Sequence, residues 1–237
     1  MSENILEKII KKKSEKINEL KKSVSIISLK DEIKEKKYFL NFKEKIEKNI
    51  EKNKISIIAE IKKASPSAGI IINDYKPEDI AEIYKKNNAT CLSVLTEEDF
   101  FLGNLSHISK IKKKIDLPVL CKDFFIDKLQ LYLARSYGAD AILIILSAVS
   151  DKLADELYYE AINLNLSIII EVHTVEEAKK ALRFKNALIG INNRNLKTLE
   201  TEINTTYKIN NILSAHSGPL ISESGIKTRE DLLDINS

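Results

Sequence analysis

The sequence predicts an α/β protein in which parallel strands alternate with helices along most of the chain. Seven short apolar runs occur after residue 53, and each is followed by an amphipathic stretch of helical length. The runs are almost continuously apolar, as strands are when helices cover both faces of a parallel sheet. With 237 residues, of which 43% are hydrophobic, the chain can bury one substantial core, so we predict a single domain.

The first part of the chain predicts helices and no strand. One helix is expected over Asn4 to Leu20, where the apolar residues fall on a single helical stripe among Lys and Glu. A second charged helix is expected over Leu40 to Glu51. We therefore assign residues 1–52 to an N-terminal helical extension and residues 53–237 to the segment that contains strands one to seven.

The first strand is expected in Ile55 to Ile61, which is rich in β-branched residues and too short for a helix. The later strands are expected near Cys91–Leu95, Val119–Lys122, Ala141–Leu146, Ile168–Val172, Leu188–Ile191 and Leu220–Ser222. Helices are expected near Pro77–Lys86, Leu105–Lys114, Lys128–Tyr137, Lys152–Asn163, Val175–Phe184, Asn204–Leu213 and Thr228–Asp234. Such crossover helices are what parallel neighbours require.

A (β/α)8 TIM barrel with an N-terminal helical extension explains this order better than an open, doubly wound sheet. The glycine-rich first turn of a doubly wound sheet is missing, and polar residues follow many strands instead of one switch point. Because the sequence supplies only seven βα units, we expect the last βα unit to be missing from this chain. The first and seventh strands would then have unpaired edges.

The charge pattern does not indicate nucleic acid as a partner, since 38 basic residues nearly balance 35 acidic ones. We interpret the triplets Lys11–Lys13 and Lys112–Lys114 as solvated helix faces. No apolar run reaches the roughly 18 residues of a membrane span, so no membrane partner is expected. Cys91 and Cys121 fit neither a disulfide framework nor a paired-thiolate zinc site, and no export segment is evident, so we expect a cytoplasmic protein.

Polar residues stand at the carboxyl ends of the predicted strands. In the first strand, alternation places Glu60 and Lys62 on the same face as Ile58. Later strands end on Lys122, Glu171, Asn192 and Glu223. In a (β/α) barrel these ends converge on one mouth, where active sites are built. An ion pair that merely plugs the barrel is the structural alternative for Glu60 and Lys62, but so many convergent polar ends indicate a catalytic site.

The histidines and cysteines add little to this site. His107, His173 and His216 show no metal-ligand spacing, so no metal is predicted. Only His173, two residues beyond Glu171, lies near the expected mouth. Strand alternation points Cys121 away from the mouth, which favours a buried thiol over a nucleophile.

Several segments carry a family resemblance in order and spacing. They are Ile58–Gly69 (IAEIKKASPSAG), Leu92–Thr96 (LSVLT), Pro118–Phe124 (PVLCKDF), Gly138–Asp140 (GAD), Gly190–Leu196 (GINNRNL) and Ile221–Ile226 (ISESGI). With these motifs the chain resembles the indole-3-glycerol-phosphate synthase family of tryptophan biosynthesis. The resemblance implies a carboxy-lyase that cyclises 1-(2-carboxyphenylamino)-1-deoxyribulose 5-phosphate to indole-3-glycerol phosphate, with loss of carbon dioxide and water. It implies no cofactor and no metal.

The resemblance also implies roles for five residues. Lys122 is the general acid that protonates the ribulose carbonyl, and Glu171 serves the dehydration as acid or base. Lys62 holds the substrate carboxylate and assists proton transfer, Glu60 tunes Lys62, and Asn192 orients substrate hydroxyls. These assignments make chemical sense, because attack on a carbonyl develops negative charge on oxygen, which an ammonium group stabilises.

By the same resemblance, further residues surround the phosphorylated substrate: Ser65, Phe124, Leu143, Arg194, Leu196, Glu223, Ser224 and Gly225. Each has a simpler interpretation when taken alone. Phe124 and Leu143 would be core residues, Arg194 a surface ion-pair partner and Gly225 a turn glycine. Two departures from the family pattern stand out: Ala68 occupies a position where many relatives carry lysine, and half of the phosphate-binding backbone is missing with the last βα unit.

Alternative functions follow from these departures. A sugar-phosphate isomerase on a related barrel would need its acid and base placed differently from Lys62, Lys122 and Glu171. An inactive or weakly binding barrel fragment, which needs a missing C-terminal segment or a partner, is the alternative outside catalysis. Such a partner could be a fused or neighbouring tryptophan-pathway enzyme, for example phosphoribosylanthranilate isomerase. The N-terminal helix is expected to cover the mouth by analogy with the family.

Overall fold

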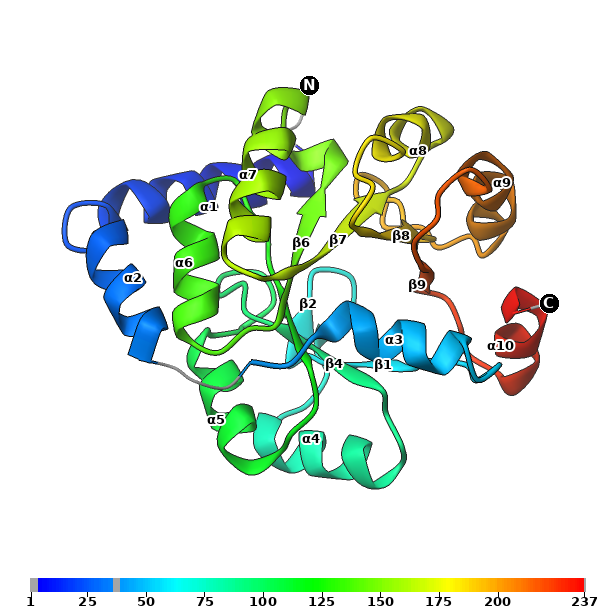
Figure 1. Ribbon diagram of the computed structural model, residues 1–237, viewed down its shortest axis with the longest axis horizontal. Coiled ribbons are helices and arrows are strands. Elements are labelled where there is room, and N and C mark those ends of the chain that lie inside the picture. The colour runs from blue at the N-terminus through cyan, green and yellow to red at the C-terminus, as the bar shows by residue number, and fades with distance from the viewer. Residues whose placement is uncertain (1–3, 36–38, 237) are drawn as a thin grey trace.

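Seven parallel strands lie side by side in one curled sheet, with helices around its outer face (Figure 1). The computed structural model describes residues 4–35 and 39–236; residues 1–3, 36–38 and 237 of the two assigned segments lie outside this description. The strands, in spatial order, are β1 (Ile58–Ile61), β4 (Cys91–Leu95), β5 (Val119–Lys122), β6 (Ala141–Ile145), β7 (Ser167–Val172), β8 (Leu188–Asn192) and β9 (Leu220–Glu223). The predicted α/β barrel architecture is confirmed. Within the described residues, β1 and β9 form the two edges of the sheet.

Helices follow the strands in the predicted order. They are α4 (Pro77–Lys86), α5 (Ser106–Lys114), α6 (Lys128–Ser136), α7 (Asp151–Asn163), α8 (Val175–Ala181), α9 (Asn204–Leu213) and α10 (Arg229–Asn236), with a short 3-10 turn at Leu146–Ala148. Pro77 occupies the first turn of α4, as expected from its fixed φ angle. Asp127 and Gln130 form a capping box that fixes the start of α6.

The N-terminal extension contains the two predicted helices and one that was not predicted. These helices are α1 (Ile5–Leu20), α2 (Ile26–Glu35) and α3 (Phe42–Ile50), and a small hairpin of β2 (Ala64–Ser65) and β3 (Gly69–Ile70), also unpredicted, follows β1. In α2, Leu29 packs against Leu129 and Tyr132 of α6. Among the described helices, none is both long and apolar enough to cross a membrane.

Strand alternation divides the apolar residues into two clusters. Ile142 and Ile144 of β6 belong to the cluster between the sheet and the surrounding helices, whereas Leu143 and Ile145 belong to the cluster inside the barrel. Cys121 lies in the outer cluster and is fully buried, which confirms the predicted direction of its side chain. Inward positions nearest the carboxyl ends carry the polar residues of the site described below.

Helix α3 closes the amino-terminal end of the barrel interior. Phe42 is fully buried there together with Cys91, the first residue of β4. The backbone N–H of Lys43 donates to Oγ of Ser167 at the start of β7 (3.1 Å). The backbone N–H of Leu40 donates to Oδ1 of Asp140, directly before β6 (2.8 Å). These contacts tie α3 to the strand starts, opposite the expected mouth.

Helix α1 lies at the other end of the interior and is fixed there by ion pairs. Nζ of Lys13 lies 2.7 Å from Oδ1 of Asp123, the residue after β5. Lys16 pairs with Glu98 and Asp99 in the loop after β4 (2.7 and 2.8 Å). Because these partners follow strand ends, α1 lies over the mouth, as expected.

The solvated interpretation of the two lysine triplets was wrong for one member of each. Lys13 is only 8% exposed and is paired with Asp123. Lys112 pairs with the fully buried Asp140 (2.7 Å), which also accepts the backbone N–H of Val119. The sequence pattern could not reveal these pairs, since both partners come from distant segments.

Candidate active site

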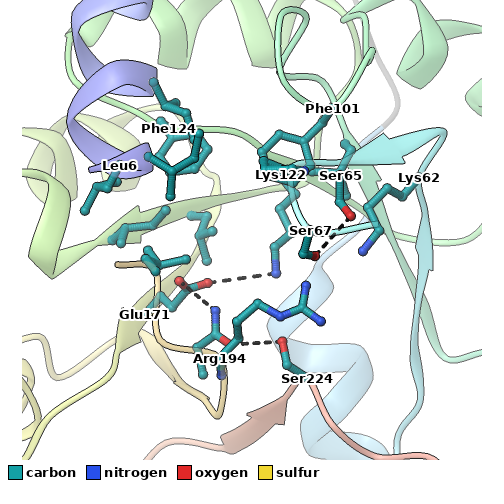
Figure 2. Close-up of a pocket in the computed structure, with 18 of the residues that line it drawn as sticks. Leu6, Lys62, Ser65, Ser67, Phe101, Lys122, Phe124, Glu171, Arg194 and Ser224 are labelled. Atoms are coloured by element: carbon teal, nitrogen blue, oxygen red, sulfur yellow. Dashed lines mark hydrogen bonds and ion pairs between the residues drawn. The ribbon is translucent and has the colours of Figure 1, made fainter. Parts of the chain in front are cut away.

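A pocket opens at the carboxyl ends of the strands beneath α1, and it joins an apolar wall to a polar floor (Figure 2). Eleven of the thirteen predicted site residues line it: Glu60, Lys62, Ser65, Lys122, Phe124, Leu143, Glu171, Asn192, Arg194, Leu196 and Ser224. Glu223 does not line this pocket but contacts Lys122 at its floor. Gly225 does not line the pocket.

Lys122 is the centre of the polar floor. Its Nζ lies 2.7 Å from Oε2 of Glu223, 3.7 Å from Oε2 of Glu60 and 3.9 Å from Oε2 of Glu171. Burial favours the neutral amine, but the three carboxylates outweigh burial and raise the pKa of Lys122. Lys122 therefore remains an ammonium group at neutral pH and is available as a proton donor.

Glu60 and Lys62 form a second pair on the same floor, as their shared strand face predicted. Nζ of Lys62 lies 2.5 Å from Oε1 of Glu60. Burial would raise the pKa of Glu60, but the charges of Lys122 and Lys62 outweigh burial and lower it. Glu60 thus touches both lysines, one with each carboxylate oxygen, and couples their positions.

Glu171 is only 1% exposed, and its two carboxylate oxygens have different surroundings. Oε1 accepts a hydrogen bond from Nδ2 of Asn192 (3.1 Å) and lies 3.2 Å from Nε2 of His173. No described residue donates a hydrogen bond to Oε2, which lies on the side of Lys122. Burial would raise the pKa of Glu171, but His173, Lys122 and Asn192 outweigh it and lower the pKa to about 2.

Glu223 reaches Lys122 because β8 carries a glycine beside it. A Cβ atom on Gly190 would lie 2.1 Å from Oε1 of Glu223, so any larger residue would displace this carboxylate. Burial, together with the charges of Glu171 and Glu60, outweighs the attraction of Lys122 and raises the pKa of Glu223. Glu223 is consequently the carboxylate of this group that takes up a proton most readily as the pH falls.

Asn192 links the floor to the rim of the pocket. Its Oδ1 accepts hydrogen bonds from the backbone N–H of Arg194 (3.0 Å) and from Oγ of Ser224 (2.9 Å). The backbone of Ser224 and Gly225 is in the left-handed region, with φ values of 67° and 82°. Gly225 therefore has the turn role that its residue type suggests.

The apolar wall was only partly predicted. Phe124, Leu143 and Leu196 contribute to it, as expected. The structure adds Ile5, Leu6 and Ile9 from α1, Phe101 from the loop after β4, and Ile145 and Leu199. The rings of Phe101 and Phe124 lie side by side, with centroids 6.3 Å apart. The position of Phe101 after a strand was a usable signal, and so was the apolar stripe of the N-terminal helix, which includes Ile5 and Ile9.

The arrangement can bind an aromatic anion and deliver protons to it. Two ammonium groups and three carboxylates meet on the floor, and a flat ring can lie against the apolar wall. Among the described residues, no group of three or more His, Cys, Asp or Glu side chains is arranged to hold a metal ion. The chemistry that these side chains can perform is acid–base catalysis.

Comparison with known proteins agrees with this geometry. The model of the family "Indole-3-glycerol phosphate synthase" matches residues 6–237. The chain is 44% identical to the indole-3-glycerol phosphate synthase of Prochlorococcus marinus subsp. pastoris, over 100% of this chain and 81% of the relative. It is 42% identical to the tryptophan biosynthesis protein TrpCF of Buchnera aphidicola, over 100% of this chain and 50% of that protein.

Among solved structures, the tryptophan synthase subunit alpha of Legionella pneumophila superposes with a TM-score of 0.57. The match covers 80% of each chain at 16% identity, which is a likeness of fold alone. The family match, by contrast, spans nearly the whole sequence and includes the segments that build the pocket floor. The chain therefore belongs to the indole-3-glycerol phosphate synthase family.

Proposed function

We propose that the chain converts 1-(2-carboxyphenylamino)-1-deoxyribulose 5-phosphate to indole-3-glycerol phosphate, releasing carbon dioxide and water as a carboxy-lyase. The observation that carries this proposal is the position of Lys122. Its ammonium group lies within 4 Å of three carboxylates, beneath a wall that can hold an aromatic ring. Membership of the family makes the reaction a part of tryptophan biosynthesis.

Ring closure begins with attack of the aromatic carbon that bears the carboxylate on the ribulose carbonyl. The amino nitrogen supplies electron density, a carbon–carbon bond forms, and negative charge develops on the carbonyl oxygen. Lys122 stabilises this charge and donates a proton to the oxygen. The electrostatic field of Glu60, Glu171 and Glu223, which keeps the ammonium charged, supports this role.

Decarboxylation then restores the aromatic ring, since the electrons of the bond to carbon dioxide return to it. Lys62 lies beside Glu60 on the polar floor, where it can hold the substrate carboxylate before this step and assist proton transfer afterwards. Glu60 tunes Lys62 through their direct contact.

Dehydration completes the indole. The hydroxyl takes a proton from Lys62, which assists proton transfer at this stage, and leaves as water; the neighbouring carbon loses a proton to a base. Glu171 is suited to be that base, because its lowered pKa keeps it ionised and its Oε2 is without a hydrogen-bond donor among the described residues. Asn192, which contacts Glu171 and Ser224, orients the sugar hydroxyls.

The remaining predicted contacts position the two ends of the substrate. Phe124, Leu143 and Leu196 flank the anthranilate ring, and Ser65 and Arg194 lie at the rim. Ser224 and Gly225 contribute the phosphate end through their left-handed turn. A fused or neighbouring enzyme of the same pathway is a further proposal, supported by the TrpCF relative, of which this chain covers 50%.

The test is the appearance of indole fluorescence when the purified chain is incubated with the substrate. We expect product from the native chain and a loss of at least about a thousandfold in kcat for Lys122→Ala, since both the proton donor and the charge are removed. Lys128→Ala, at an exposed lysine on α6, is the matched control and should retain activity.

Two results would contradict the proposal. Near-normal turnover of Lys122→Ala would discard the catalytic assignment. Binding of the substrate without any turnover by the native chain would instead favour the alternative of an inactive or weakly binding barrel.

A further inference from the structure

His173 lies at the edge of the site and joins two acidic side chains. It follows β7 and is 10% exposed at its side chain. Its Nε2 lies 3.2 Å from Oε1 of Glu171, and its Nδ1 lies 3.3 Å from Oε2 of Glu177 on α8. The Nδ1 contact is a hydrogen bond, whereas Nε2 makes a close charge contact with Glu171 without hydrogen-bond geometry. Because a carboxylate faces each ring nitrogen, the surroundings favour the imidazolium, in which both nitrogens carry a proton.

Hydrogen bonds hold Glu177, on the far side of His173 from the pocket. Oε2 of Glu177 also accepts the backbone N–H of His173 (2.7 Å). The backbone N–H of Glu177 in turn donates to Oγ1 of Thr174, the N-cap of α8 (3.2 Å). The first turn of α8 therefore holds Glu177 in place. Oε2 of Glu177 in turn holds His173 at two points, the backbone N–H and the ring nitrogen Nδ1.

The near side holds Glu171 in one orientation. Two side chains approach Oε1 of Glu171. His173 comes from the end of β7, the strand that carries Glu171, and Asn192 comes from the end of β8. This leaves Oε2 on the side of Lys122, buried and without a hydrogen-bond donor among the described residues. A carboxylate held by one oxygen keeps the other in a defined position, here beside Lys122 on the pocket floor.

We propose that His173 is a positioning residue of this enzyme, which clamps one oxygen of Glu171 from behind and keeps Glu171 ionised and ready to accept a proton through the other. The inference rests on the proposed function, because it assigns Glu171 as the base of the dehydration. It assigns no chemistry to His173 itself, which does not line the pocket.

The electrostatics of the neighbouring groups agree with this geometry. The titratable groups that face His173 are Glu171 of β7 and Glu177 of α8. Those that act on Glu171 are His173, Lys122 of β5, and the carboxylates of Glu60 on β1 and Glu223 on β9. Burial would lower the pKa of His173, but the two carboxylates outweigh burial and raise it to about 9. The imidazolium then offsets the penalty of burying the Glu171 carboxylate.

The decisive experiment is the pH dependence of kcat/KM in His173→Gln and Glu177→Gln, with Glu176→Gln on the exposed face of α8 as the matched control. In the native chain Glu171 stays ionised well below its ordinary pKa of 4.5, so activity should persist toward low pH. Without the imidazolium, burial raises the pKa of Glu171, and an acidic limb should move up by at least about one pH unit. Glu177→Gln should produce a smaller shift in the same direction, and Glu176→Gln none.

A second measurement does not depend on turnover. In protein with isotopically labelled histidine, nitrogen NMR should show one imidazole, lost in His173→Gln, with both ring nitrogens protonated at pH 8. His107 and His216 should be neutral there, since burial lowers the pKa of each. A chain without turnover but with this imidazolium signal would contradict the proposed function and still support the clamp.

The clamp is overturned by either of two results. One is a neutral His173 at pH 7 in the NMR spectrum. The other is an acidic limb that stays in place in His173→Gln and Glu177→Gln, because a merely structural role would lower kcat or stability without moving the limb. Should His173→Gln fail to fold, Glu177→Gln decides the question, since Glu177 lies on the surface side of the imidazole.

Discussion

Nζ of Lys122 and Oε2 of Glu223 lie 2.7 Å apart, although the two residues are separated by 101 positions in the sequence. The pair joins the ends of β5 and β9, and two further carboxylates share the same ammonium group. Because these negative charges raise the pKa of Lys122, removing one of them should lower it.

Glu223→Gln is therefore expected to shift the basic limb of the pH–kcat profile to lower pH while the fold is retained. The amide keeps the shape of the side chain but not its charge, so Lys122 loses its proton at a lower pH. We expect a decrease in kcat of about tenfold to a hundredfold at neutral pH. Measurement of kcat between pH 6 and 11 checks this, since the native chain should show no basic limb from Lys122 below its ordinary pKa of 10.5 and Glu223→Gln should show one at lower pH. Identical profiles would show that Glu223 does not control the proton on Lys122.

Gly190→Ala tests whether β8 makes room for this carboxylate. The added Cβ would approach Oε1 of Glu223 to 2.1 Å, so the side chain of Glu223 has to move. We expect kcat to fall by about tenfold with little change in the melting temperature, since the end of a side chain yields more easily than backbone. The double variant Gly190→Ala/Glu223→Ala should be no slower than Glu223→Ala alone, because both changes act through the same group. Additive losses would contradict this coupling.

Lys13→Ala tests the ion pair that fixes α1 over the mouth. Its partner Asp123 is 8% exposed and would keep hydrogen bonds from Thr96 and from the backbone of Phe124, but it would lose its counter-charge. We expect a loss of about 1.5–3 kcal/mol in the free energy of unfolding, measured in urea. KM should also rise, since α1 supplies part of the apolar wall.

Lys12→Ala is the control for this prediction. Lys12 is 49% exposed at its side chain and pairs with Glu15 on the same helix, so its removal should cost less than about 0.5 kcal/mol. Equal effects of the two substitutions would mean that the buried pair does not hold α1 in place.

The stabilising effect of His173 should depend on pH with a defined sign. Its pKa rises from an ordinary 6.5 to about 9 on folding, so the contribution is fully present below pH 6.5 and is lost as the pH rises through about 9. The difference in unfolding free energy between the native chain and His173→Phe should accordingly shrink by about 1–3 kcal/mol over this interval. Denaturant titrations at pH 6, 7.5 and 9 measure it, and a difference that grows with pH would contradict the assignment.

Much of the fold was predictable, because β-branched runs and helical stripes depend on local sequence. The ends of elements were less so: β1 begins at Ile58 instead of Ile55, and α8 ends at Ala181 instead of Phe184. Phe184 follows the helix and packs its ring against Tyr158 of α7. Helix α2 escaped prediction since its buried residue, Leu29, gains its apolar surroundings only from α6.

The site was predictable where its residues end strands, because the barrel brings those ends together whatever lies between them. Glu60, Lys122 and Glu171 meet for this reason. Contacts contributed by a distant helix, such as that of Leu6, required the tertiary structure. The same holds for the two lysines that were wrongly taken as solvated, whose acidic partners lie outside their own helices.

A helix covers each end of the barrel interior, and both helices come from the N-terminal extension. Phe42 of α3 packs into the amino-terminal end, and Leu6 of α1 lines the candidate active site at the carboxyl-terminal end. Deletion of residues 1–52 would expose both ends to water at once. Water would then reach the interior apolar cluster at one end and the polar floor of the pocket at the other. Thermal stability and turnover should therefore be lost in the same deletion variant.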